Sequence, residues 1–322
     1  MFLHRLTIQA MAWSSLHLRT HDNMDRLLSR KDALLNLESY QHDGNGNLTQ
    51  FTDRRGKVAV FSYDGLNRRT FAGFGMQAGP TYESTVTNTY DAGNRLTQSV
   101  DSIGGTITRS YDGLDRLISD ATPQGTVSYT QDGAGRRASL TVPGHAVVNY
   151  SFDNANRLTQ VTQGSTTVSF GYDNANRRTT LTLPNGVVTS YSYNSASQLT
   201  GMTYSLGQTM LGNLTYSYDN DGRRNTMGGS LARTGLPLAV SQTAYNANNQ
   251  LTQWGTANLF YDLNGNMTSN GTDGYTWNAR NNLVSTLSGA NFQYDAFGRR
   301  TSKTVGGTTT SFLYDGANVF RR

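Results

Sequence analysis

The sequence predicts an all-β protein in which tandem β-hairpins form a long antiparallel sheet. Three observations support this fold class. A Tyr-Asp motif recurs about every twenty residues, a turn-forming residue follows it at a fixed distance, and strand-forming residues lie between the copies. A strand, a turn and a return strand make one hairpin per repeat, and a second turn joins each hairpin to the next.

The repeat is clearest in Tyr63-Asp64-Gly65-Leu66-Asn67-Arg68-Arg69, whose residues we number as positions 1 to 7. Tyr and Asp fill positions 1 and 2 in Tyr63-Asp64, Tyr90-Asp91, Tyr111-Asp112, Tyr172-Asp173, Tyr218-Asp219, Tyr261-Asp262, Tyr294-Asp295 and Tyr314-Asp315. Degenerate copies begin at His21, His42, Gln131, Phe152, Tyr193, Tyr245 and Trp277. Fifteen copies at near-constant spacing are no chance pattern. We therefore predict that these Tyr and Asp residues have structural roles.

Position 5 is predicted to close a tight turn. It holds Gly, Asn or Asp in fourteen of the fifteen copies, and these residues tolerate a positive φ angle. Position 2 is Asp in twelve copies and Asn in three, so its short side chain can accept hydrogen bonds from backbone amides two residues on. The Arg that often fills position 6 is expected to pair with a neighbouring Asp or to cover an aromatic ring.

The strands on either side of this turn follow from the remaining positions. The residue two before position 1 is aromatic in ten copies, which places both rings on one face of a strand. Position 7 is usually Leu and begins the next strand. The Leu-rich stretch 24–37 resembles an amphipathic helix, but the repeat spacing predicts strands there. The longer gaps at 71–89 and 228–244 are expected to be surface loops.

Composition restricts the function. Only 36% of residues are hydrophobic, which argues against a thick core, and the absence of cysteine excludes disulfides, thiol nucleophiles and thiolate metal sites. The basic residues, 27 in all, are not clustered into runs, so nucleic-acid binding is not expected despite the net charge of +5. No apolar run reaches the length of a membrane span, and no signal peptide is evident at the start.

The Tyr-Asp-x-x-Gly/Asn-Arg-Leu unit resembles the YD repeats of bacterial Rhs proteins, wall-associated proteins, insecticidal toxin complexes and animal teneurins, from about His21 to Arg322. The resemblance implies that the sheet curves into a partial hollow shell. It further implies a structural segment of an Rhs-type polymorphic toxin, or of a secreted or cell-surface protein, whose shell encloses or presents a C-terminal effector. The implied partners are the rest of such a shell or its effector.

The repeats also set the expected domain organisation. Residues 1–20 are expected to be an irregular N-terminal segment, followed by a YD-repeat region at 21–322 with about fifteen repeats. The segment from Phe312 to Val319 resembles the stretch shortly before the end of the Rhs core, and the Asp-Pro-x-Gly-rich segment that comes after it in the family does not appear. We therefore expect a fragment of a longer protein, truncated before the core end. Self-cleavage and an enclosed toxin are not carried over to this chain.

We expect no catalytic residue, no cofactor and no metal ion, and thus no enzyme. Equivalent Asp residues in a dozen copies are structural by default, although glycosidases also use pairs of carboxylates. The five histidines lack metal-ligand spacing, and Asp219-Asn220-Asp221-Gly222 resembles part of a calcium loop but lacks its downstream glutamate. The aromatic rows are expected to pack the sheet. The alternative is a module that binds a heparin-like glycan or a partner protein, with the Arg residues as a basic stripe.

Overall fold

The computed structural model describes residues 5–9, 17–77, 79–233 and 240–321, and every regular element in these residues is a β-strand. The all-β prediction is therefore confirmed. The chain divides into two compact units, of which unit 1 comprises Met1–Gly125 and Ala239–Arg322 and unit 2 comprises Thr126–Leu238. The described residues contain no helix with the length and hydropathy needed to cross a membrane.

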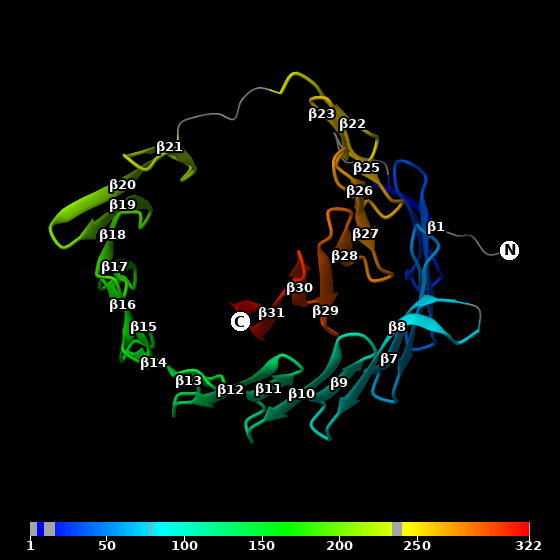
Figure 1. Cartoon of the computed structure of the whole chain (residues 1–322), viewed down its shortest axis with the longest axis horizontal. Helices are drawn as coiled ribbons and strands as arrows, with labels where there is room; N and C mark the ends of the chain where they lie inside the picture. The colour runs from blue at the N-terminus through cyan, green and yellow to red at the C-terminus, as the bar shows by residue number, and fades with distance from the viewer. Residues whose placement is uncertain (1–4, 10–16, 78, 234–239, 322) are drawn as a thin grey trace. The chain divides into compact units, whose positions relative to one another are not determined.

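The first segment of unit 1 is an antiparallel meander in which each strand pairs with the next along the chain (Figure 1). Its strands are β1 (Arg5–Gln9), β2 (His17–His21), β3 (Leu27–Lys31), β4 (Leu37–His42), β5 (Leu48–Thr52), β6 (Val58–Tyr63), β7 (Arg69–Met76), β8 (Tyr82–Tyr90), β9 (Leu96–Asp101), β10 (Gly105–Tyr111) and β11 (Leu117–Thr122). We call this segment the N-terminal strip.

Unit 2 continues the same pattern of strands. They are β12 (Gly125–Gln131), β13 (Arg137–Thr141), β14 (Val148–Phe152), β15 (Leu158–Gln163), β16 (Thr166–Tyr172), β17 (Arg178–Thr182), β18 (Val187–Tyr193), β19 (Leu199–Leu206), β20 (Thr209–Tyr218) and β21 (Arg224–Gly228). Each of them pairs antiparallel with its neighbour in sequence, as a meander requires.

The second segment of unit 1, which we call the C-terminal strip, has shorter strands. They are β22 (Thr243–Tyr245), β23 (Leu251–Trp254), β24 (Ala257–Asn258), β25 (Phe260–Tyr261), β26 (Met267–Ser269), β27 (Tyr275–Trp277), β28 (Leu283–Thr286), β29 (Asn291–Tyr294), β30 (Arg300–Val305), β31 (Thr308–Asp315) and β32 (Asn318–Arg321). Repeats here are separated by as few as sixteen residues, which leaves less chain for each strand.

The turn at positions 2 to 6, which we call the YD turn, has the same backbone hydrogen bonds in fourteen of the fifteen copies. In the copy at Tyr63, the amide of Asp64 donates to the carbonyl of Arg68 at 3.0 Å, and the amide of Asn67 donates to the carbonyl of Asp64 at 3.0 Å. Asn67 has a φ of 60°, and the strand register shifts where Tyr63 pairs with Arg69. A tight turn followed by one left-handed residue and a bulge is a common three-residue hairpin connection.

The left-handed conformation predicted for position 5 is confirmed in fourteen copies. These residues are Asp25, Gly46, Asn67, Asn94, Asp115, Gly135, Asn156, Asn176, Ser197, Gly222, Asn249, Gly265, Asn281 and Gly298. The prediction is wrong for the last copy. There Asp315 pairs directly with Asn318 across a two-residue hairpin, so Gly316, with a φ of 58°, takes the left-handed position in place of Asn318.

Two of three local predictions can be compared with the structure over all or nearly all of their length. The stretch 24–37 forms the end of a YD turn, β3 and the start of β4, so the strand prediction is confirmed against the helix. The surface loop predicted at 71–89 is wrong, because β7 and β8 extend through most of it and the insertion lengthens the hairpin. The predicted loop at 228–244 lies partly outside the described residues, which resume at 240.

The segment 1–20, predicted to be irregular, contains β1 and most of β2 in its described part. The two strands pair with Arg5 opposite His21, and β2 in turn pairs with β3. The boundary drawn before residue 21 therefore falls inside a strand.

The core is thin, as the low hydrophobic content predicts. The described hydrophobic residues that are buried in unit 1 are Ala59, Ala72, Val86, Ile107 and Leu313, and those in unit 2 are Val127, Tyr129, Leu140 and Val142. With so few buried apolar groups, polar contacts between repeats become a large share of the stabilising interactions.

Candidate functional site

The Asp at position 2 closes its own turn with both carboxylate oxygens. In the copy at Tyr63, Oδ1 of Asp64 accepts hydrogen bonds from the amides of Leu66 and Arg68 at 2.9 and 3.0 Å, and Oδ2 accepts one from Nε of Arg68 at 2.7 Å. The same three bonds recur at Asp22, Asp91, Asp112, Asp132, Asp153, Asp173 and Asp295. The predicted acceptor role of position 2 is confirmed in these copies.

The Arg at position 6 ties each repeat to the following one. Nη1 of Arg68 donates to Oδ1 of Asn94 at 2.8 Å and to the carbonyl of Asp91, and the guanidinium lies 4.8 Å from the centre of the Tyr90 ring. Equivalent contacts are made by Arg95, Arg136, Arg157 and Arg177. Position 5 therefore does more than adopt a left-handed conformation, because its side chain is also the acceptor that the preceding Arg reaches.

The Tyr at position 1 ties each repeat to the preceding one. The hydroxyl of Tyr63 donates to the carbonyl of Leu48, at position 7 of the previous copy, over 2.9 Å. The same bond is donated by Tyr90, Tyr111, Tyr172, Tyr193, Tyr218, Tyr261, Tyr294 and Tyr314. At Trp277, the indole nitrogen donates the equivalent hydrogen bond to the carbonyl of Met267. Neighbouring repeats are thus joined in both directions, and we call this set of contacts the YD ladder.

The ladder depresses the pKa of its carboxylates. The backbone amide of Arg157 lowers the pKa of Asp153, its guanidinium lowers it further, and partial burial opposes both. The pKa is likewise lowered at Asp22, Asp43, Asp64, Asp91, Asp112, Asp132 and Asp173. At Tyr63 and Tyr314, burial raises the pKa of the phenol. A carboxyl group that serves as a general acid near neutral pH needs the opposite shift.

Three of the predicted Tyr-Asp copies depart from the common geometry. Asp219 closes its turn through backbone amides, while Arg223 points away to Asp221 and remains 78% exposed. Asp262 bonds Asn266, which replaces Arg at position 6. Asp315 belongs to the two-residue hairpin described above. In the described part of the chain, no three His, Asp or Glu side chains are grouped so as to hold a metal ion.

A second polar row lies in unit 1, at the opposite ends of the strands, and our sequence reasoning missed it. The turn between one hairpin and the next, which we call the inter-repeat turn, carries Asp32 and Asp53 in the N-terminal strip, and both are buried. Each closes its turn as a position-2 Asp does, by accepting the amides two and four residues on. Their remaining oxygens face side chains from the C-terminal strip.

Two asparagines at position 4 of C-terminal copies make the same contact one repeat apart. Asn248 accepts a hydrogen bond from the amide of Ala33 at 3.0 Å and donates one to Asp32 at 2.8 Å. Asn264 accepts from the amide of Arg54 at 3.0 Å and donates to Asp53 at 2.6 Å. The repetition of one bonding pattern shows that the two strips are docked in register within unit 1.

The next two copies continue the docking with charged and aromatic groups. Arg280, again at position 4, donates to the fully buried Asp101 at 2.5 Å and to Ser84 at 3.0 Å. Phe297, at position 4 of the following copy, lies with its ring centre 4.4 Å from the guanidinium carbon of Arg109. The C-terminal copies at Tyr245, Tyr261, Trp277 and Tyr294 therefore all use position 4.

Close backbone approach completes this docked edge. A Cβ atom on Gly104 would lie 2.4 Å from the carbonyl oxygen of Tyr294, so only glycine fits there. Asp120 of the N-terminal strip is 3% exposed and pairs with Arg109 at 3.3 Å and with Arg299 of the C-terminal strip at 3.4 Å. Buried carboxylates are stable only when paired in this way.

One sequence signal pointed to this second row. Asp53-Arg54-Arg55-Gly56-Lys57 has the spacing of a YD turn from position 2 to position 6, and Gly56 is left-handed with a φ of 79°. The equivalent turn at Asp32 is not recognisable in the sequence, because Leu35 holds the left-handed position at a φ of 67° in place of Gly, Asn or Asp. A search for Asp followed three residues later by Gly would have found the turn at Asp53 but not the turn at Asp32.

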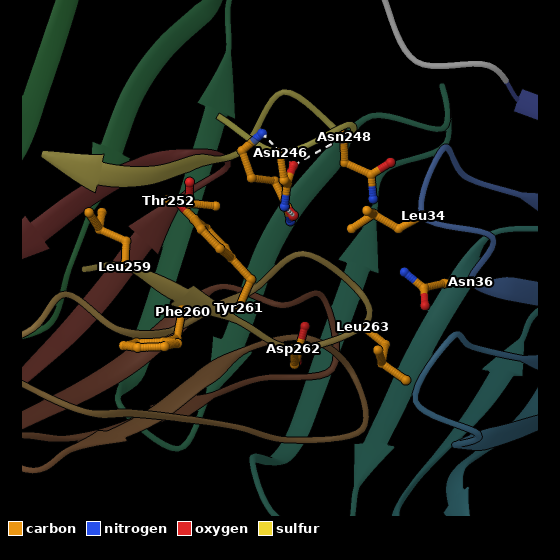
Figure 2. A pocket seen from close by; sticks show the side chains of 11 residues that line it. Leu34, Asn36, Asn246, Asn248, Thr252, Leu259, Phe260, Tyr261, Asp262 and Leu263 are labelled. Carbon is orange, nitrogen blue, oxygen red and sulfur yellow. Dashed lines mark hydrogen bonds between the residues drawn. The ribbon is translucent and has the colours of Figure 1, made fainter. Parts of the chain in front are cut away.

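A pocket of about 240 Å³ opens where this docking begins, between the turn of Leu34 and the copies at Tyr245 and Tyr261 (Figure 2). Amide groups of Asn36 and Asn248 line it together with the ring of Phe260, which is more than half exposed. The pocket therefore combines a ring face with hydrogen-bonding groups.

Comparison with known proteins agrees with this geometry. The profile of the Teneurin YD-shell family matches residues 106–223 and 189–319, and the RHS Repeat profile matches residues 42–70. The tRNA3(Ser)-specific nuclease WapA of Bacillus spizizenii is 38% identical over 112 residues, which are 33% of this chain and 5% of that protein. The tRNA nuclease WapA of Bacillus subtilis gives the same identity and coverage.

Solved structures show the same fold. The crystal structure of TcdB2-TccC3-Cdc42 aligns with 99% of this chain at a TM-score of 0.68 and 14% identity, over 23% of its own length. That of TcdB2-TccC3 aligns with 98% at a TM-score of 0.67 and 12% identity, over 24% of its length. The chain thus spans a small part of each protein it matches.

The resemblance to Rhs and teneurin YD repeats that the sequence suggested is confirmed by the family profiles, which together match more than half of the chain. The chain belongs to the Teneurin YD-shell family.

Proposed function

We propose that this chain is a structural segment of a YD-repeat shell in an Rhs-type toxin or in a secreted or cell-surface protein. In the full-length protein, the shell encloses or presents a C-terminal effector. The observation that carries the proposal is the YD ladder. The residues that define the motif, such as Asp153 and Arg157, are occupied by bonds within the turn and to the next repeat. Residues that are used in this way hold the repeats together as one continuous sheet.

The proposed scaffold role extends over the YD-repeat region at 21–322. The relatives named as tRNA nucleases match this chain over only 5% of their length. We propose that this chain contributes the scaffold of such a protein and no catalytic group. Its partners are then the neighbouring repeats of the shell and the effector.

Protection of an attached segment tests the enclosing role. An unstructured tail with one protease site is fused after Arg322 of the full chain, and the same tail is fused to an unrelated compact carrier. A shell segment that covers the attached tail should slow its cleavage roughly tenfold relative to the carrier, because cleavage then requires opening. Equal cleavage rates on the two carriers would contradict enclosure.

A glycan-binding role is the second candidate, and the pocket in Figure 2 is the observation that favours it. An exposed ring beside amide side chains is a suitable surface for a sugar. Saturable retention on a heparin column or a glycan array at physiological salt, lost in the Phe260→Ser variant, would support this role. A pure scaffold should show no saturable retention.

A further inference from the structure

Position 4 of the YD turn is a docking position in unit 1. Four consecutive C-terminal copies place Asn248, Asn264, Arg280 and Phe297 against the inter-repeat turns or strands of the N-terminal strip. One edge of each strip takes part in this contact, namely the YD-turn edge of the C-terminal strip and the inter-repeat edge of the N-terminal strip. Among the described residues of unit 1, the hydrogen bonds at the opposite edge of each strip stay within that strip.

The opposite edge of the N-terminal strip carries large apolar side chains at position 4. Met24 is 65% exposed, Leu66 is 64% exposed and Leu114 is 74% exposed. These three residues alternate with Asn45 and Gly93 in the intervening copies. Exposed apolar groups at a position that docks elsewhere in the same unit point to an interaction surface.

The opposite edge of the C-terminal strip has a matching pattern at its inter-repeat turns, where Leu287 is a turn residue and Trp254 ends β23. Leu287 is 82% exposed and Trp254 is 52% exposed. The turn between them, from Asn270 to Asp273, is polar. Along both edges, an apolar side chain is thus followed by a polar group in the next repeat and by an apolar side chain in the one after, so the apolar groups are two repeats apart. Two repeats contain four strands, which places the apolar groups about 19 Å apart on each edge.

We propose that the YD-turn edge at Met24, Leu66 and Leu114 binds the inter-repeat edge at Trp254 and Leu287 of a second copy of this chain. The contact repeats between two copies the arrangement that joins the two strips within unit 1. Because the two surfaces differ, it is a head-to-tail contact, and copies can add at both ends. A second copy is the occupant because this chain itself carries both edges.

Analytical ultracentrifugation of the full chain tests the proposal. Between about 1 and about 100 µM, the range for a small interface, the wild-type chain should form a concentration-dependent series of oligomers. The variant M24N/L66N/L114N, which carries the Asn that Asn45 provides at the same position, should sediment as a monomer. The matched control A134N/A155N/A175N changes position 4 in unit 2 and should associate like the wild type. Circular dichroism checks that both variants are folded.

Mixing two edge variants makes the test specific. W254S/L287S loses the apolar side chains of the inter-repeat edge and keeps those of the YD-turn edge. M24N/L66N/L114N loses the apolar side chains of the YD-turn edge and keeps those of the inter-repeat edge. Each should be monomeric alone, and an equimolar mixture should form a one-to-one dimer. A wild-type chain that stays monomeric over the whole range, a position-4 variant that still oligomerises, or a mixture that stays monomeric would each overturn the proposal.

Discussion

The inter-repeat turns differ between the two units, although their YD turns are built alike. In unit 1 they carry Asp32, Asp53 and Asp101, which are buried against the C-terminal strip. In unit 2 the corresponding turns, such as Val142–His145 and Leu183–Gly186, contain Pro and Gly and are mostly exposed. The buried carboxylates of the described residues all lie in unit 1.

Position 4 shows the same contrast. It holds Asn248, Asn264, Arg280 and Phe297 in the docked copies, and Ala in four successive copies of unit 2. The comparison teaches that two sets of positions have separate tasks. Positions 1, 2, 5 and 6 build a strip, and position 4 together with the inter-repeat turn decides whether an edge of that strip docks.

Acidification should have the largest effect, because it acts on both units. Hydrogen bonds from Arg157 lower the pKa of Asp153 in unit 2. Burial raises the pKa of Asp101 in unit 1, but Arg280 and two backbone amides outweigh it and lower the pKa overall. Since the folded pKa values lie below the unfolded value of about 3.9, their stabilisation is present above about pH 5 and is lost as the pH falls through the folded values.

Urea unfolding at pH 7, 5, 4 and 3 measures this loss. The unfolding midpoint should hold between pH 7 and 5 and then fall steeply. Hydrogen exchange should show both units losing protection at low pH, whereas an unchanged midpoint at pH 3 would refute the assigned role of the carboxylates.

The Arg280→Ala variant should be the most destabilising single change, and its effect should be confined to unit 1. It leaves the Asp101 side chain, which is 0% exposed, without its guanidinium partner. Breaking a buried pair from one side costs about 3–5 kcal/mol of unfolding free energy. Urea unfolding measures the loss, and hydrogen exchange locates it. Arg223→Ala, at an exposed arginine of unit 2, is the control and should change the free energy by less than about 0.5 kcal/mol.

The Asn264→Ala variant tests one docked position without a change of charge. It leaves the amide of Arg54 unpaired and removes one hydrogen bond from Oδ2 of the buried Asp53, which Arg55 continues to bond, and this loss should cost about 1–3 kcal/mol. Asn45→Ala removes an Asn from the same position of an undocked copy and should cost less than about 0.5 kcal/mol. Equal unfolding free energies for the two variants would show that position 4 has no docking role.

The Arg157→Lys variant should give the smallest of these effects, and only in unit 2. Lysine keeps the charge but cannot bond Asp153 and Asn176 in the same fork, so we expect a loss of about 0.5–1.5 kcal/mol. Faster hydrogen exchange in β14 to β17, with unchanged exchange in unit 1, would be the signature. Arg223→Lys is the control, and a similar loss in it would count against the ladder.

The strip could be predicted from the sequence because its contacts are local. Gly, Asn and Asp at position 5 indicate the tight turn, and aromatic residues spaced two apart indicate the strand that precedes it. The exception, Asn318, lies in a copy that has the same letters but closes as a two-residue hairpin. Repeat spacing alone could not reveal that difference.

The docked edge could not be predicted, because its partners lie far apart in the chain. Ala33 and Asn248 are 215 residues apart, and the repeats that meet there have steps of 21 and 16 residues. Position 4 also varies from Asn to Arg to Phe, since each docked copy meets a different partner. Only the three-dimensional register shows that these unlike residues all dock the C-terminal strip on the N-terminal strip.

Cross-linking tests the docked register most directly, and the chain has no native cysteine to interfere. The amide of Ala33 and the side chain of Asn248 are 3.0 Å apart, so A33C/N248C should be joined rapidly by a short bifunctional maleimide. The off-register pair A33C/N264C should not be joined under the same conditions. Efficient cross-linking of the first pair alone is the result that we predict. No cross-link in the first pair, or equal yields in both, would contradict the account.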